Sequence, residues 1–270
     1  MATSPTNRHD PPGTHRRALL AAFEAALAAV NGRTAVAICL RRGAAPEQVT
    51  LVAVGKAAQS MALGALDAWG PAIAGGLVIG KGGHLDAALL ASQGLDAVEG
   101  GHPLPDAGSV EAGRRLLRLL EALPPARPLL LLISGGASAL VEVPVPGLGV
   151  EDLQCANRWL LGSGLDIARM NRVRKALSRI KAGGLLRWIG KRPVRALLIS
   201  DVPGDDPAVI GSGLLVPDAG PGPEPDPALP PWLAAAVGAG LRDRAADPMP
   251  AAPDLEIVAR LDDARRAAAA

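Results

Sequence analysis

Short, almost continuously apolar runs recur along the chain, and they constrain its fold more than any other feature. They cover residues 49–54, 76–79, 128–133 and 194–199, and each ends at a glycine or a polar turn. Runs of this length are typical of strands that are buried on both faces, and their alternation with helical patterns indicates a parallel sheet. The pattern predicts an α/β protein, with a Rossmann-like layered domain, a mostly parallel sheet and helices on both faces.

The turns that end these runs share one position in the predicted sheet. They are the segments 55–56, 80–84, 134–136 and 200–201, which are rich in glycine, lysine, serine and aspartate. In open parallel sheets the ligand crevice lies outside the carboxyl ends of the strands. We therefore expect these four turns to lie along the ligand-binding edge of the sheet.

Composition divides the chain into four parts. Residues 1–15 lack periodicity and are expected to form a disordered tail, and 16–216 hold the α/β domain. Residues 217–254 form a proline-rich linker, with a short helix expected near 232–242. The last segment, 255–270, has the pattern of one strand and the opening turns of a helix. We interpret it as the start of a truncated C-terminal domain, whose strand lacks the sheet it belongs to.

Charge and cysteine content argue against several classes of protein. The formal net charge is +2, with 28 basic residues interleaved among 26 acidic ones, which argues against nucleic-acid and membrane-surface partners. Cys39 and Cys155 lie far apart and outside any metal-ligand motif, as expected of free thiols in a reducing compartment. The longest uncharged apolar stretch, around 129–141, is too short and too broken by glycine to span a bilayer.

The N-terminal segment allows two readings. The arginine pair 16–17 before an apolar stretch superficially fits a twin-arginine export signal. However, Glu24 interrupts that stretch, and the spacing of Leu20 and Phe23 is that of an amphipathic helix over 16–30. We expect a cytoplasmic protein with no membrane partner.

The common nucleotide-binding fingerprints are absent from the sequence. The pair Gly55-Lys56 lacks the first glycine of a P-loop, because Thr50 stands there, and Ala57 replaces the required Ser or Thr. No G-x-G-x-x-G occurs, so a nicotinamide cofactor would lack its phosphate-binding turn.

Four segments carry residues suited to phosphate or carboxylate chemistry, and each has an ordinary structural alternative. Lys56 could clamp an anion or be a solvated surface lysine. The turn 134–138 could cradle an anion or simply join a strand to a helix. The basic stretch 171–181 could surround a phosphate or form a solvated helix face. Asp201 could bind Mg²⁺, act as a base, or cap the next helix.

The order of these segments resembles a known family. VGKAAQSM, GLVIGKGGH, GGHPLPDAGSVEAGR, LLISGGASAL, DIARMNRVRKALSRIKAGGL and LISDVPGDDPAVIGSG follow one another as in the glycerate 2-kinases, whose members often carry the name hydroxypyruvate reductase. The resemblance covers residues 16–218. It implies transfer of the ATP γ-phosphoryl group to the 2-hydroxyl of D-glycerate, with ATP and Mg²⁺ as cofactors.

The same resemblance implies roles for individual residues. Lys56 binds and orients the substrate, and Asp201 is the candidate for the general base or for a ligand of the metal. The residues that the resemblance assigns to substrate or phosphate binding are Ser134, Gly135, Gly136, Ser138, Arg174, Lys175 and Lys181. This division suits phosphoryl transfer, in which positioning and electrostatic stabilisation lower most of the barrier.

Departures from the family pattern leave three hypotheses open. The segment 212–220 differs from the usual connector, and Ala182 stands where glycine is common. The family continues into a second domain that supplies the other wall of the cleft, so we expect this chain alone to have little activity. The alternatives are a truncated glycerate kinase, a non-catalytic remnant that binds an acidic metabolite, and an NAD-dependent hydroxypyruvate reductase. A homo-oligomer is compatible with all three.

Overall fold

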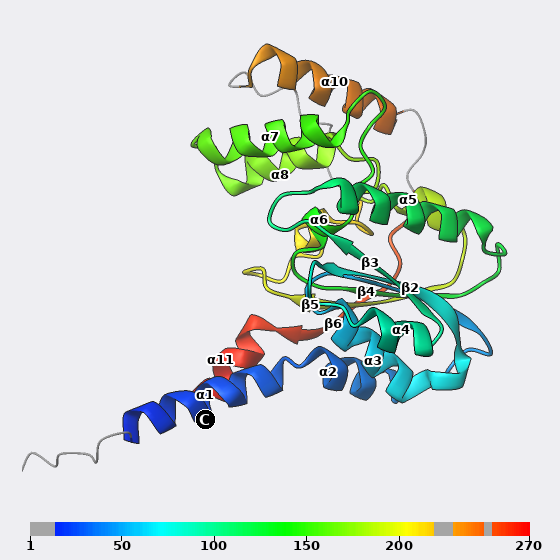
Figure 1. The fold of residues 1–270 in the computed structure, drawn as a ribbon, viewed down its shortest axis with the longest axis vertical. Helices are drawn as coiled ribbons and strands as arrows, with labels where there is room; N and C mark the ends of the chain where they lie inside the picture. The colour runs from blue at the N-terminus through cyan, green and yellow to red at the C-terminus, as the bar shows by residue number, and fades with distance from the viewer. Residues whose placement is uncertain (1–13, 219–228, 246–249) are drawn as a thin grey trace, which may run out of the picture.

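A parallel sheet forms the centre of the computed structural model, which describes residues 14–218, 229–245 and 250–270 (Figure 1). In these residues the sheet has six strands in the order β3-β2-β1-β4-β5-β6, with every neighbouring pair parallel. The strands are β1 (Val49–Val54), β2 (Ile73–Lys81), β3 (Leu95–Gly100), β4 (Leu129–Ile133), β5 (Val194–Ser200) and β6 (Leu255–Arg260). The predicted α/β class and mostly parallel sheet are confirmed.

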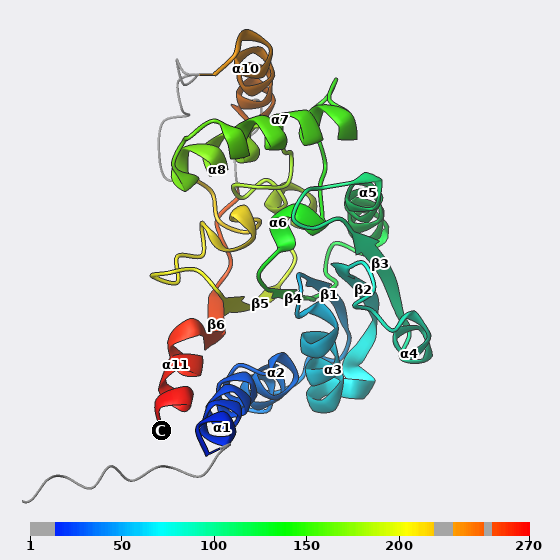
Figure 2. The same ribbon diagram turned by 60° about the vertical axis from the view of Figure 1, so that its left-hand side comes forward.

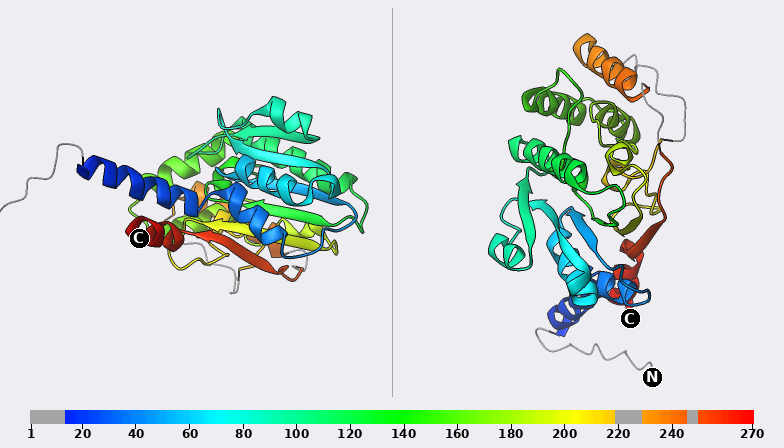
Figure 3. Two further views of the ribbon diagram at one scale, coloured as in Figure 1. Left: turned by 90° about the horizontal axis from the view of Figure 1, so that it is seen from below. Right: turned by 90° about the vertical axis from the view of Figure 1, so that its right-hand side faces the viewer.

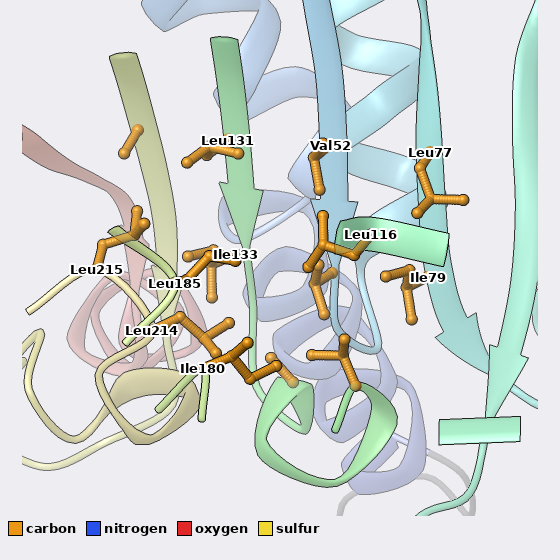
Figure 4. Close-up of a cluster of buried hydrophobic side chains, with 14 of the residues drawn as sticks. Val52, Leu77, Ile79, Leu116, Leu131, Ile133, Ile180, Leu185, Leu214 and Leu215 are labelled. Atoms are coloured by element: carbon orange, nitrogen blue, oxygen red, sulfur yellow. The ribbon is translucent and has the colours of Figure 1, made fainter. Parts of the chain in front are cut away.

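The central strands are apolar because both of their faces are covered. All residues of β1 and β4 are buried, and the two strands pair in register from Thr50 with Leu129 to Val54 with Ile133. Alternate residues point to opposite faces, so that Val52 and Leu131 meet one layer while Leu51 and Leu130 meet the other (Figure 4). This two-sided burial is what the continuous apolar runs predicted.

Helices pack on each face of the sheet, and the two layers are visible in Figures 1 and 2. One layer holds α2 (Gly32–Leu40), α3 (Ala58–Trp69) and α4 (Ala87–Ser92), which bury a core around Leu40, Met61 and Leu90. The other holds α5 (Ala107–Ala122), α6 (Ala137–Leu140) and α9 (Leu186–Ile189). Two short 3-10 helices lie in connections, η1 (Gly70–Ala72) after α3 and η2 (Ile210–Ser212) against α6. Figure 4 shows Leu116 from α5 and Leu185 beside α9 against the second face.

A group of helices lies beyond the second layer, farther from the sheet (Figure 2). It consists of α7 (Val150–Gly162), α8 (Ile167–Ala176) and α10 (Pro231–Ala245), which share their own apolar cluster. Leu153 and Leu160 of α7 pack there with Leu233 of α10, which is fully buried. The helix predicted near 232–242 is therefore present, and it packs on α7 and α8. Residues 219–228 of the predicted linker lie outside the described residues.

The first described helix exposes much of its apolar side. The helix expected over 16–30 is present as α1 (Thr14–Ala29), so Thr14 and His15 are helical, and the rest of the predicted tail lies outside the described residues. Its apolar stripe is largely exposed, with Phe23 60% and Leu27 53% accessible. By length and hydropathy alone, the stretch His15–Leu40, which covers α1 and α2 with a break at Asn31, is long and apolar enough to cross a membrane, and it lies near the N-terminus.

Strand β6 corrects an expectation from the sequence. We expected residues 255–270 to stand outside the sheet, but β6 pairs in parallel with β5, with Ala196 opposite Leu255 and Leu198 opposite Ile257. The pairing places β6 at the sheet edge, where the Glu256 carboxylate lies 3.0 Å from the Arg195 guanidinium of β5. The following helix, α11 (Leu261–Ala269), runs beside α1 (Figure 3). The prediction that this strand lacks a sheet partner is wrong.

Candidate functional site

The site begins where the order of the strands reverses. The chain proceeds from β1 outward to β2 and β3, then returns to β4 on the other side of β1 and continues to β5 and β6. In such sheets the loops that leave the two central strands diverge and open a crevice at their carboxyl ends. Here those loops begin at Gly55-Lys56 after β1 and at Ser134-Gly135-Gly136 after β4.

Backbone hydrogen bonds hold these two loops against each other. The Lys56 N–H donates to the Gly135 carbonyl at 2.9 Å, and the Ala57 N–H donates to Ser134 Oγ at 3.0 Å. The approach requires glycine at position 55, because its φ is +131° and a Cβ there would lie 2.1 Å from Ser134 Oγ. Ser134 is thus a buried structural partner of the Lys56 loop.

The side chains of Lys56 and His102 meet at Gly136. A Cβ on Gly136 would lie 3.1 Å from Lys56 Cγ and 3.2 Å from His102 Cδ2, and the residue has a left-handed φ of +87°. Burial lowers the pKa of His102 first, Lys56 and Lys81 lower it further, and Asp201 acts in the opposite direction. His102 therefore stands as a neutral imidazole among two lysines and a carboxylate.

Asp201 reaches the same edge from β5. A Cβ on Gly135 would lie 2.1 Å from Asp201 Oδ2, so the carboxylate sits directly over the glycine turn. Its side chain is exposed and has no ion-pair partner within the described parts of the chain. The structure thus brings together Lys56, Asp201 and the 134–138 turn, as the topology predicted.

A cavity of about 210 Å³ lies next to this edge, and His102 and Gly136 are part of its wall. Ser138 contributes from α6, where its hydroxyl is 2.7 Å from that of Ser212. The other polar side chains of the wall are Glu142, Asn157, Arg174 and Lys181. The cavity has room for a small polar metabolite.

Arg174 enters the cavity wall from the last turn of α8 with neutral partners. Its Nε donates to Asn157 Oδ1 at 2.8 Å and its Nη1 lies 3.3 Å from Asn171 Oδ1. Burial lowers the pKa of the guanidinium, and no carboxylate among the described residues pairs with it. A guanidinium stays charged at neutral pH, so this one leaves a positive charge at the wall that an anionic ligand can neutralise.

Lys181 has a different environment from Arg174. Its ammonium pairs with the Glu142 carboxylate, and the two side chains are only 4% and 2% exposed. The Glu142 carboxylate also accepts hydrogen bonds from the Ser178 hydroxyl and, at 3.0 Å, from the Val143 N–H. The charge of Lys181 is therefore balanced inside the protein before any ligand binds.

The structure places some of the predicted binding residues in the cavity wall and others outside it. Lys175 does not line the cavity, and its Nζ lies 2.6 Å from Asp218 Oδ1. Gly135, Gly136, Ser138 and the side chains discussed above remain predictions as functional residues, because geometry alone assigns them no role. The sequence analysis assigned no functional role to His102, Glu142 or Asn157. For His102 the available signal was its place shortly after an edge strand that the apolar pattern missed.

The carboxylates after β5 bear on metal binding. Asp205 pairs with Arg260 at 3.1 Å, and Asp206 accepts a hydrogen bond from the Ala208 N–H. Of these three carboxylates, Asp201 is the one that lies against the 134–136 turn. The described residues contain no group of three or more His, Cys, Asp or Glu side chains that could hold a metal ion. A single carboxylate fits Mg²⁺ that is bound mainly through substrate phosphates and water.

Comparison with known proteins places this arrangement in a family. A family model described as "Domain of unknown function (DUF4147)" matches residues 18–224. The D-glycerate 2-kinase of Thermotoga maritima is 40% identical over 173 residues, which are 64% of this chain and 41% of that protein. An Agrobacterium vitis protein named "Putative hydroxypyruvate reductase" is 37% identical over 207 residues, 75% of this chain and 45% of that protein.

A solved structure gives the same result at the level of the fold. The crystal structure of glycerate kinase from Thermotoga maritima aligns with a TM-score of 0.77 and 30% identity, covering 95% of this chain and 62% of that one. The chain thus spans less than half the length of the two sequence relatives and under two thirds of the solved one. Its family match, its relatives and its fold together show that the chain belongs to the glycerate 2-kinase family.

Proposed function

We propose that the chain takes part in the ATP-dependent phosphorylation of D-glycerate at its 2-hydroxyl, in the cytoplasm. The observation that carries the proposal is the position of the Arg174 guanidinium, which is half-buried and has no carboxylate partner in the described residues. It borders the cavity whose wall includes Gly136, the glycine that Lys56 contacts. The kinase names of the relatives favour phosphoryl transfer over reduction of hydroxypyruvate.

Neither Arg174 nor Lys56 pairs with a carboxylate in the described residues, and we assign each of them one anionic group of the reactants. Arg174 lies in the cavity wall, and its planar guanidinium suits a carboxylate, so we assign it the carboxylate of D-glycerate. Lys56 lies at the exposed edge, next to the glycine turn, where a flexible ammonium suits a phosphate oxygen. This assignment differs from the family resemblance, which implied that Lys56 binds and orients the substrate.

Asp201 is the residue that would hold Mg²⁺, which neutralises phosphate charge when it is bound with ATP. Its carboxylate over Gly135 lies on the same edge as Lys56, and both side chains are exposed. A site of this kind binds the metal together with the nucleotide. Positioning by Lys56, Asp201 and Arg174 then supplies the electrostatic stabilisation on which phosphoryl transfer depends.

Calorimetric titration with D-glycerate tests the proposal on the chain itself. Arg174→Gln should weaken binding by about 10- to 100-fold, the value expected for loss of a charged hydrogen bond. The matched control is Lys175→Gln on the same helix, because Lys175 pairs with Asp218 outside the cavity. Formation of 2-phosphoglycerate from ATP is measured in parallel. Failure of the unaltered chain to bind D-glycerate, or equal weakening by both substitutions, would refute the proposal.

A further inference from the structure

His102 occupies the junction between the two parts of the site. It lines the cavity together with Arg174, and its ring also lies against Gly136 of the 134–138 turn, where the Lys56 side chain meets the same glycine. A ligand whose carboxylate is held by Arg174, with its reacting end toward Lys56, must pass beside the imidazole. No other titratable side chain in the described residues both lines the cavity and contacts the glycine turn.

The loop that carries His102 is held in place by the start of α5. The Gly101 N–H donates to Asp106 Oδ1 at 2.9 Å and to Ser109 Oγ at 3.0 Å. Asp106 in turn caps α5 by accepting the Ser109 N–H. The backbone next to the histidine is thus fixed before a ligand enters, which favours precise placement of the ring.

The imidazole itself is left without a hydrogen-bond partner. Neither of its ring nitrogens bonds to another group in the described portion of the protein. Its burial and the charges of Lys56 and Lys81 lower the pKa, while Asp201 on β5 opposes them. Arg174 and the balanced Lys181–Glu142 pair face it across the cavity. At neutral pH the ring therefore has one nitrogen lone pair available to accept a hydrogen bond.

We propose that His102 recognises the reacting hydroxyl of the substrate and accepts its proton during transfer. The inference rests on the proposed function, since it takes D-glycerate and ATP as the reactants. The 2-hydroxyl oxygen forms a bond to the γ-phosphorus as the bond from that phosphorus to the β,γ-bridging oxygen breaks. The hydroxyl proton passes to the free imidazole nitrogen, and ADP leaves with the bridging oxygen. Asp201, whose carboxylate lies against Gly135, then remains available to hold the metal.

The first experiment compares binding of D-glycerate with binding of 3-hydroxypropionate, which lacks the 2-hydroxyl, by titration calorimetry. The unaltered chain should prefer D-glycerate by about five- to tenfold, the contribution of one net hydrogen bond. His102→Leu should bring this ratio near one, whereas His102→Gln should keep it, because an amide oxygen also accepts a hydrogen bond. His84→Leu is the matched control, as His84 is exposed and outside the cavity wall.

The second readout is formation of 2-phosphoglycerate from saturating D-glycerate and ATP. His102→Gln should bind substrate normally and lose turnover by about 100-fold or more, because an amide cannot take up the proton. An unchanged binding ratio in His102→Leu overturns the recognition role while the proposed function stands. Normal turnover in His102→Gln overturns the proton transfer. Absence of D-glycerate binding by the unaltered chain refutes the proposed function, and this inference with it. Binding without turnover overturns the proton transfer in this chain and leaves the proposed binding site standing.

Discussion

The buried pair of Glu142 and Lys181 gives the sharpest prediction about stability. Replacing Glu142 with Gln preserves the shape of the side chain but removes the negative charge beside the Lys181 ammonium. Both side chains are almost fully enclosed, at 2% and 4% exposure. Water therefore cannot take over the role of the missing carboxylate, and the ammonium is left as an uncompensated charge in a poorly polarisable interior.

The expected loss follows from this enclosure. Removal of one partner of a buried ion pair costs about 3–5 kcal/mol in free energy of unfolding. A domain has in total about 5–15 kcal/mol, so the variant should remain folded but close to the limit. For a chain of this size the loss corresponds to a fall in melting temperature on the order of 10 °C.

Urea unfolding followed by tryptophan fluorescence and circular dichroism measures this loss. The exposed pair of Arg33 and Asp67 provides the control, and Asp67→Asn should cost about 0–1 kcal/mol. The double replacement Glu142→Leu with Lys181→Met should recover most of the stability, because it removes both charges together. The reasoning is refuted if Glu142→Gln costs no more than the surface control, or if the double replacement is less stable than either single one.

Two further predictions concern the edge of the sheet. Gly55→Ala places a methyl group 2.6 Å from the Ser134 backbone carbonyl oxygen, at a φ of +131°, and should lower stability by about 1–3 kcal/mol. Gly43→Ala, with open space around it, should be near neutral, and equal effects in differential scanning calorimetry would contradict the close approach. Lys56→Met should raise the pKa of His102 and Asp201→Asn should lower it, since the lysine disfavours the imidazolium and the aspartate favours it. An NMR titration of the imidazole measures both, and a pKa unmoved by either substitution would show that the groups do not share one site.

The sheet was largely predictable because its central strands are buried on both sides. Such burial demands continuous apolar runs, and those runs are visible in β1, β4 and β5 without any structure. The edge strand β3 escaped prediction because its exposed positions hold Asp96 and Glu99, which break the run. The pairing of β6 escaped it because nothing local in the sequence tells which strand a distant strand will join.

The candidate site was predictable only as far as topology determines it. The carboxyl ends of neighbouring parallel strands converge, so Lys56 and Asp201 could be placed together from the order of the elements. The environments of Lys175 and Lys181 could not be told apart, because each depends on a carboxylate 39 or more residues away along the chain. For the same reason the neutral surroundings of Arg174 have no signature in the sequence.

The late position of β6 in the chain has a consequence for biosynthesis. Strand β5 is complete at Ser200, but β6 begins only at Leu255, so 54 residues lie between the two strands. At about 5–20 residues per second, that interval lasts about 3–11 s. Throughout it, the hydrogen-bonding groups of β5 face outward on the ribosome-bound polypeptide and can pair with any extended peptide nearby. The time during which a chaperone is most useful to β5 is therefore set by the distance in sequence between β5 and β6.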